Sequence, residues 1–299
     1  MLKGIKIITR AINRNPLTKN NRFSAWRRFI KWQFVSRLYP NGIVISYIGE
    51  SKLLIKKSMH GATGAIYLGL QEFEDMSFLL HFLREDDHFI DVGANIGSYT
   101  ILAACVSKAN VISFEPIPQT FNSLQLNIRL NNIESKVRAI NKGLGDRKAV
   151  LRFTSAYDTV NHVLIDNTRN DFIEVEVITL DDYFSDEGIL MPSLIKIDVE
   201  GFELNVLKGA GKILQNDALK VIIVEINGCC NSFNIKEIDI HNKIISYGFK
   251  PYQYHPFLRE FLLLESFIPN GNTIYIRDEE FVSKRLKSSV SFKVLDKVI

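Results

Sequence analysis

Three acidic residues each lie at the end of a short apolar run. Asp91, Glu115 and Asp198 follow runs rich in Ile, Val, Leu or Phe, a pattern typical of buried strands. Because the carboxyl ends of parallel strands meet at one edge of a sheet, these carboxylates should converge on one pocket. A carboxylate beside the cofactor turn would repel a phosphate but favour an ammonium or sulfonium group.

A glycine turn follows the first of these acids. The stretch Gly93-Ala94-Asn95-Ile96-Gly97 contains two glycines, which allow a tight turn and a close backbone approach to a ligand. After the turn, Ile101, Ala104 and Cys105 recur at helical spacing. A strand, a glycine turn and a helix start together predict a pocket for a nucleotide-like cofactor.

The spacing of this turn argues against a dinucleotide. The NAD pattern G-x-G-x-x-G, started at Gly93, would need glycines at Asn95 and Ser98. Glu115 is placed to accept both ribose hydroxyls of an adenosine, as acids do in sites for NAD and for S-adenosylmethionine (SAM). We therefore favour SAM as the cofactor.

Methyl transfer from SAM to a hydroxyl of high pKa needs a group that removes the proton. Asp198 is the first candidate, and it could instead bind the SAM amino group. Glu200 and His162 are further candidates; His162 lies in the polar, aperiodic stretch 158–163. Glu203 stands where a helix is expected to begin, so we favour a capping role for it.

Three motifs carry a family resemblance. D-V-G-A-N-I-G-S-Y-T (91–100), F-E-P (114–116) and L-I-K-I-D-V-E-G-F-E (194–203) resemble the FkbM family of SAM-dependent methyltransferases, over about residues 67–277. The resemblance implies O-methylation of macrolide or glycan hydroxyls. With the motifs above, it leads us to assign cofactor binding to Glu72, Asp91, Gly93, Asn95, Gly97, Tyr99, Thr100, Glu115, Pro116, Gly145 and Asp146.

The same sheet edge contains residues that could bind a metal. Glu225 and Asn227 end another apolar run and could join Asp198 as oxygen ligands for Mg²⁺. Acids at strand ends are common, and the family resemblance does not imply a metal. We therefore expect no metal.

Alternating strand and helix patterns predict an α/β fold of the Rossmann-like class I methyltransferase type. We expect a mainly parallel seven-stranded sheet with helices on both faces. An antiparallel pair, 149–154 and 172–180, is expected as an insertion, and one helix is expected over 203–214. We expect three parts: a basic N-terminal extension of helix and hairpin (residues 1–66), the methyltransferase domain (67–280) and a C-terminal tail with few order signals (281–299). Residues 61–67 are expected to form a flexible link between the first two.

Charge is unevenly distributed along the 299 residues. The chain has a net charge of +4, but residues 1–40 contain basic residues and no acid. Phe23, Trp26, Ile30, Phe34 and Leu38 repeat there at helical spacing. We expect this stripe to pack on the main domain; the alternative is contact of residues 1–40 with anionic lipid or a lipid-linked glycan. No nucleic-acid-binding motif is present, so we expect no nucleic-acid partner.

The remaining composition is that of an ordinary globular protein, with 46% hydrophobic and 23% charged residues. Three cysteines without disulfide or metal spacing, no signal peptide and no long apolar run predict a cytoplasmic protein, with possible peripheral contact at the inner membrane face.

The sequence thus predicts a SAM-dependent methyltransferase. We expect an O-methyltransferase acting on a sugar, a glycan or another polyhydroxylated small molecule. The alternatives are an N-methyltransferase, a non-catalytic SAM-binding scaffold in glycan assembly, and a disfavoured NAD-dependent oxidoreductase. The acceptor and the oligomeric state are left open.

Overall fold

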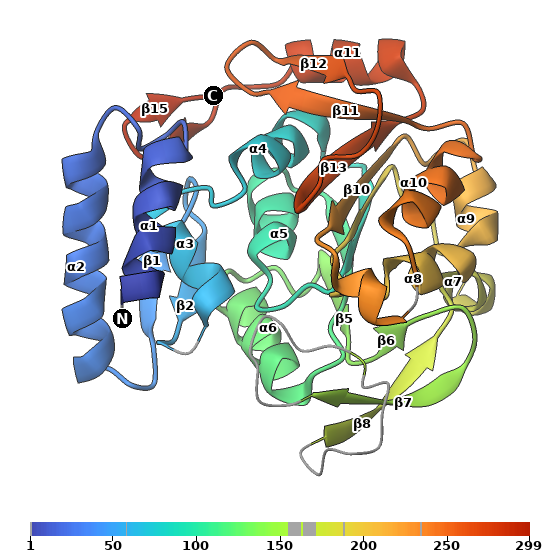
Figure 1. The fold of residues 1–299 in the computed structure, drawn as a ribbon, viewed down its shortest axis with the longest axis horizontal. Helices are drawn as coiled ribbons and strands as arrows, with labels where there is room; N and C mark the ends of the chain where they lie inside the picture. Colours follow the sequence, from blue (N-terminus) through green and yellow to red (C-terminus); the bar gives the residue numbers. More distant parts are fainter. Residues whose placement is uncertain (1, 58, 155–162, 164–171, 188, 234) are drawn as a thin grey trace.

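The computed structural model describes all residues except 1, 58, 155–162, 164–171, 188 and 234. Its centre is a sheet of eight described strands (Figure 1). From one edge to the other these are Glu260–Leu263 (β12), Lys250–His255 (β11), Gly271–Ile276 (β13), Val221–Ile226 (β10), Leu194–Ile197 (β9), His88–Val92 (β3), Asn110–Phe114 (β4) and Val137–Ile140 (β5). The strands from β10 to β5 are parallel, whereas β13, β11 and β12 join by antiparallel pairing.

The expected α/β class is confirmed, with eight strands in the sheet where seven were expected. The additional strand is β12, an edge strand whose Leu262 and Leu263 are exposed. It gave a weak burial signal in the sequence because only Phe261 of this strand packs on the core.

The central strands are apolar on both faces, as parallel strands between two helix layers must be. Phe89 pairs with Leu194, which pairs with Val221, and these side chains belong to one hydrophobic cluster. The next residue on each of these strands faces the other cluster. This alternation fixes the register, because a slip of one residue would exchange the two faces.

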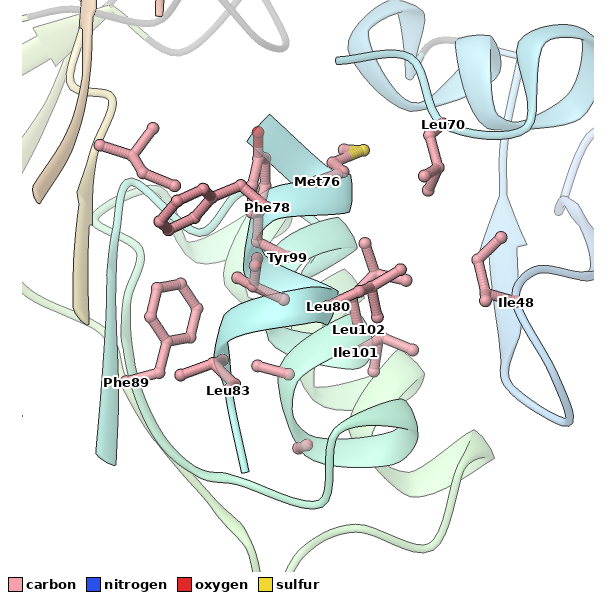
Figure 2. Packing of buried hydrophobic residues seen from close by; sticks show 14 of the residues in the cluster. Ile48, Leu70, Met76, Phe78, Leu80, Leu83, Phe89, Tyr99, Ile101 and Leu102 are labelled. Carbon is pink, nitrogen blue, oxygen red and sulfur yellow. The ribbon is translucent and has the colours of Figure 1, made fainter. Parts of the chain in front are cut away.

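One helix layer covers the face of the sheet to which Phe89 of β3 belongs. It contains Phe73–Phe82 (α4), Ser98–Ile101 (α5), which continues as a π-helical turn to Val106, and Pro118–Leu130 (α6). Figure 2 shows Phe78 of α4 and Leu83 near Phe89 of β3, and Leu80 of α4 beside Ile101 of α5 and Leu102. These contacts fix the segment that carries the glycine turn.

The opposite layer consists of four helices that cover the second cluster. They are Leu180–Glu187 (α7), Glu203–Lys208 (α8), Gly211–Gln215 (α9) and Glu237–Ile245 (α10), with a 3₁₀ turn at Cys229–Phe233. A three-stranded sheet of Gly143–Leu144 (β6), Ala149–Thr154 (β7) and Phe172–Ile178 (β8) lies beside this layer. The β7–β8 pair is antiparallel, as expected for the insertion.

The N-terminal region consists of helices and a hairpin. The elements are Leu2–Arg14 (α1), Arg22–Leu38 (α2), Ile43–Ser46 (β1), Lys52–Ile55 (β2) and His60–Leu68 (α3). The hairpin is joined to α6, because the Leu54 amide donates to Asn127 Oδ1 at 2.7 Å. The expectation of a flexible link at 61–67 was wrong: α3 occupies it, and its small residue Gly64 lets Gln71 pack closely.

The expected packing of the apolar stripe on α2 holds for Trp26, which is partly buried, but was wrong for the other four residues of the stripe. Phe23, Ile30 and Phe34 are exposed, whereas Ala25 and Trp32 on the opposite side are buried. The period of the stripe was correct, but periodicity alone does not say which face meets the core. No described helix is both long enough and apolar enough to cross a membrane.

The C-terminal segment is ordered, contrary to the expectation for residues 281–299. It forms the helix Glu279–Lys287 (α11) and a hairpin of Lys293–Val294 (β14) and Lys297–Val298 (β15). Arg285 forms an ion pair with Asp87 at 2.5 Å, directly before β3. A few buried residues, such as Val294, and a partly buried charge pair thus attach a segment whose composition is polar.

The single helix expected over 203–214 is two helices, α8 and α9, separated at Gly209. A Cβ at Gly209 would lie 2.0 Å from the carbonyl oxygen of Gly145, and the Gly209 carbonyl accepts from Asp181 N. The close backbone contact therefore requires glycine and interrupts the helix.

We predict that Gly209→Ala destabilises the protein by about 1–3 kcal/mol, because the backbone of Gly145 would have to move. Gly211→Ala is the matched control, since a Cβ there meets no atom closer than 3.6 Å. Urea unfolding should show a clear loss for the first variant and little change for the second. Equal midpoints would contradict this account of the helix break.

Candidate active site

A cavity of about 260 Å³ opens at the carboxyl ends of β3, β4, β9 and β10. Of the residues assigned to the site from sequence, those that line it are Glu72, Asp91, Gly93, Asn95, Tyr99, Glu115, Pro116, Asp198 and Glu200. Gly97, Thr100, Gly145 and Asp146 do not line it. His162 lies outside the described residues, so its role stays a prediction.

The glycine turn has a left-handed backbone at three positions. Gly93, Asn95 and Gly97 have φ values of +80°, +53° and +95°. A Cβ at Gly93 would lie 1.9 Å from the carbonyl oxygen of Asp198. The turn after β3 therefore packs directly against the end of β9 at Gly93, and this contact places Asp198 beside the turn.

Glu115 fixes the geometry of the turn. Its two carboxylate oxygens accept from the amides of Asn95 and Ile117, both at 3.0 Å. The side chain is almost fully buried. Burial raises the pKa of Glu115 to about 7, although these backbone donors oppose the shift. Each oxygen still has a lone pair for a ligand donor.

Asp91 lies deeper, at the end of β3. Its Oδ2 accepts from Thr100 Oγ1 at 2.6 Å, and that hydroxyl contacts Ser113 Oγ at 2.7 Å. Burial raises the pKa of Asp91 to about 6, while Lys196 and Thr100 act in the opposite direction. Thr100 thus contacts Asp91 and not the cavity itself.

Lys196 is a residue that the sequence analysis missed. It lies on the central strand β9, is almost fully buried and lines the cavity. Its Nζ is 2.7 Å from Asp198 Oδ2 and 4.7 Å from the centre of the Tyr99 ring. Burial lowers the pKa of Lys196, but the carboxylates of Asp198, Glu72 and Asp91 raise it by a larger amount. The pKa therefore lies above its ordinary value, and the ammonium stays charged. The sequence signal was a lysine within a strand otherwise apolar on both faces.

Glu72 and Tyr99 extend this charged group. Tyr99 donates its hydroxyl proton to Glu72 Oε2 at 2.5 Å, and Asn272 Nδ2 donates to the same oxygen at 3.0 Å. The start of α4, the start of α5 and strand β13 therefore meet at one carboxylate. Asn272 was not expected at the site from the sequence.

Asp198 and Glu225 form a coupled pair beside Lys196. Burial would raise the pKa of Asp198, but Lys196 lowers it below its ordinary value. Burial and the adjacent charge of Asp198 raise the pKa of Glu225. At neutral pH, Asp198 is therefore ionised and Glu225 carries the proton between them.

Glu200 completes an acidic group at the mouth of the cavity. Its backbone is left-handed, with φ of +51°, and Asn227 Nδ2 donates to its Oε2 at 3.0 Å. Oxygen atoms of Asp198, Glu200 and Glu225 lie within 4.8 Å of one another. Acidic groups of this kind are common without a metal, so this grouping alone does not define a cation site.

Glu203 is buried but does not line the cavity. It accepts from the Gly201 amide at 2.9 Å, so it folds the turn between β9 and α8. Burial raises the pKa of Glu203 to about 7. This position favours the structural role expected for Glu203.

The opposite end of the cavity is apolar. Ile117, Leu144, Phe153 and Phe202 line it. Gly145 lies behind this wall, where its amide donates to Ile178 at 3.0 Å, and Asp146 lines a separate hollow. The cavity therefore has an apolar end, a carboxylate at Glu115 and a charged end around Lys196.

A mainly parallel α/β sheet with a cofactor-sized cavity at the carboxyl ends of its strands defines the Rossmann-like class of folds. Within it, residues 91–267, more than half of the chain, match the family model described as the methyltransferase FkbM domain. The chain therefore belongs to the FkbM methyltransferase family.

Individual relatives agree with this family. The hexuronic acid methyltransferase AglP of Haloferax volcanii is 33% identical over 156 residues, which cover 52% of this chain and 62% of that protein. Methyltransferase 1 of Beauveria bassiana is 30% identical over 149 residues, covering 42% and 59% of the two chains. The chain thus spans about three fifths of each of these relatives. A crystal structure of an FkbM methyltransferase from Methylobacillus flagellatus has a TM-score of 0.45 and 16% identity, covering 84% of this chain and 59% of that one.

The raised carboxyl pKa values predict how stability depends on pH. Asp91, Glu115 and Glu203 release their protons near pH 6 to 7 in the folded protein but near pH 4 when unfolded. The folded state therefore binds more protons between these values, and the free energy of unfolding should fall as pH rises from about 4 to 7.

Urea unfolding across this pH range would measure the effect. Glu203→Gln keeps an acceptor for the Gly201 amide but removes one titrating group, so its pH dependence should be shallower. Glu260→Gln, an exposed acid on β12, is the control and should match the unmodified protein. An unchanged slope in Glu203→Gln would refute the assignment.

Proposed function

We propose that this protein transfers a methyl group from SAM to a hydroxyl group of a sugar or another polyhydroxylated acceptor. The observation that carries the proposal is the cavity at the strand ends, lined by Asp91, Glu115 and Asp198, all within the segment matched by the family model. When bound, SAM supplies an electrophilic methyl group on a sulfonium.

The charge and shape of the cavity support this cofactor. Its carboxylates favour a cationic ligand and disfavour the pyrophosphate of a dinucleotide. Ile117, Leu144 and Phe202 offer an apolar surface for an adenine. Glu115 lines the same cavity, and its free lone pairs suit the two ribose hydroxyls.

Asp198 is our first candidate for the group that receives the proton of the acceptor hydroxyl. Lys196 and the protonated Glu225 hold its carboxylate in one orientation and keep it ionised. The lowered pKa makes Asp198 a weaker base. Its ability to orient the acceptor hydroxyl therefore matters as much as its basicity. Glu200 at the mouth is the second candidate, and His162 remains a third.

The acceptor class rests on relatives. AglP is named a hexuronic acid methyltransferase, and another relative, from Streptomyces tacrolimicus, is named 31-O-demethyl-FK506 methyltransferase FkbM; it is 27% identical over 205 residues. The first name gives a sugar acid as the acceptor, and the second gives a 31-O-demethyl compound. Carboxylates at the mouth of the cavity can accept hydrogen bonds from acceptor hydroxyls.

We predict that Glu115→Ala weakens SAM binding by about 1–3 kcal/mol, roughly five- to 150-fold in Kd, because hydrogen bonds to a buried carboxylate are lost. Isothermal titration calorimetry would measure this. Glu203→Gln, a buried acid that does not line the cavity, is the control and should bind normally. Unchanged affinity in Glu115→Ala, with the fold intact by circular dichroism, would remove Glu115 from the ribose role. Binding of NAD in place of SAM would refute the proposed cofactor.

We predict that Asp198→Asn reduces turnover by roughly 10²–10⁴-fold while SAM affinity changes little, as expected for loss of a general base. Methylated products from a panel of sugars and amines, followed by mass spectrometry, would provide the assay. If affinity and turnover fall together, Asp198 binds the cofactor instead. Normal turnover in Asp198→Asn, with loss in Glu200→Gln, would transfer the role to Glu200.

Lys196→Met offers an independent test of the same assignment. Without the ion pair, the pKa of Asp198 should rise, so the acidic limb of the pH–rate profile should move to higher pH. A limb that stays in place would show that Asp198 does not control it.

A further inference from the structure

The outward face of α2 is an apolar surface in contact with solvent. Phe23 is 81% exposed, Ile30 is 51% exposed and Phe34 is 67% exposed. The three side chains lie on one side of the helix, opposite the buried Ala25 and Trp32. Leu38, 75% exposed, extends the same face toward the helix end. We call these four residues the α2 face.

Basic side chains surround the α2 face. Arg27, Lys31 and Arg37 are exposed on the same half of the helix. Helix α1 lies beside α2 (Figure 1). Its Lys6, Arg10 and Arg14 line a shallow surface hollow. Residues 1–40 contain no acid, so this region carries positive charge that nothing within it neutralises.

The α2 helix is firmly attached on its other side. Phe29 packs edge-on against Trp26 and Tyr67, with ring centres 5.7 and 5.6 Å apart. Arg28 Nη2 donates to the Tyr67 carbonyl at 3.0 Å. The outward orientation of Phe23, Ile30 and Phe34 is therefore set by the fold, because rotating the helix would expose this packed side.

We propose that the α2 face binds the surface of an anionic phospholipid membrane. A helix that presents large apolar residues among Lys and Arg can lie in the interface, with apolar side chains at the boundary of headgroups and acyl chains. The basic residues would contact lipid phosphates, and those of α1 would add to the attraction. This extends the molecule beyond its methyl-transfer site.

Charge decides against a second copy of the chain as the occupant. A symmetric contact through the α2 face would bring two acid-free basic regions together, which like-charge repulsion opposes. A wholly apolar partner would leave the cations without counter-charges. An anionic membrane satisfies both the apolar and the basic side chains.

The α2 face also has a structural connection to the cavity. Helix α3 packs against α2 through the cluster that contains Ala25 and Leu68, and Ala62 of α3 lines the cavity. A membrane-bound molecule would therefore fix the position of the cavity relative to the lipid surface through two packed helices.

Vesicle flotation of the full chain tests the proposal. We expect binding to phosphatidylcholine vesicles that contain about one third phosphatidylglycerol, weaker binding to phosphatidylcholine alone, and release as salt rises from about 0.05 to 0.5 M. Combined Phe23→Ser, Ile30→Ser and Phe34→Ser should weaken binding by more than about tenfold. Combined Arg27→Gln and Lys31→Gln should weaken it roughly 30-fold at low salt.

The matched control is Leu262→Ser with Leu263→Ser, which removes two exposed apolar side chains of β12 and should leave binding unchanged. No binding of the unmodified protein to anionic vesicles at low salt would overturn the proposal, as would full binding by the triple variant. Sedimentation that shows a dimer dissociated by Phe34→Ser, without vesicle binding, would assign the face to a second copy instead.

Discussion

The ion pair between Lys196 and Asp198 is the interaction on which the site depends. A lysine on a central strand, buried on both sides, costs several kcal/mol in lost hydration unless opposite charges compensate it. Asp198 provides the direct partner at 2.7 Å, while Asp91 and Glu72 add attraction. The same ammonium lowers the pKa of Asp198, and the resulting charge raises that of Glu225. The protonation states of the charged end therefore follow from one buried cation. An apolar residue at this position would stabilise a sheet equally well, so the contribution of the lysine is to the electrostatics of the cavity.

Close contacts between glycine backbones and the carbonyl groups of other segments bring these charges together. The Gly93 turn lies against the carbonyl of Asp198, and Gly209 lies against the carbonyl of Gly145. The first contact joins β3 to β9, and the second joins the break between α8 and α9 to the wall behind the apolar end of the cavity. Glu115 then fixes the turn through the Asn95 and Ile117 amides. The absence of a Cβ at two glycines, together with one buried carboxylate, thus determines the shape of the cavity before any ligand binds.

Much of this could be predicted from sequence because the relevant signals are local. Strand ends such as Asp91 and Glu115 were found because apolar runs mark buried strands, and the class of fold followed from their alternation with helices. Local signals fail where long-range packing decides. Residues 61–67 have the composition of a link but form α3 because their small side chains pack closely, and 281–299 is held by the Arg285–Asp87 pair, whose partners lie far apart in sequence. Asn272 reaches Glu72 across a similar separation. Lys196 was visible in the sequence, but its role needed the three-dimensional positions of its acidic neighbours.

Helix α2 shows why an apolar stripe does not identify the buried side of a helix. The period of Phe23, Ile30 and Phe34 identifies a helix face, and burial in the protein is the usual reason for such a face. Here the packed side uses Ala25, Trp32 and Phe29 instead, so the helix has apolar residues on two sides. A helix of that kind with an exposed apolar side loses hydrophobic stabilisation in water and regains it only when another surface covers that side. Because the region is also free of acids, its surroundings select a negatively charged cover. The charges of the chain are thus separated between two regions. The basic N-terminal region favours anions, and the acidic cavity favours a cationic ligand.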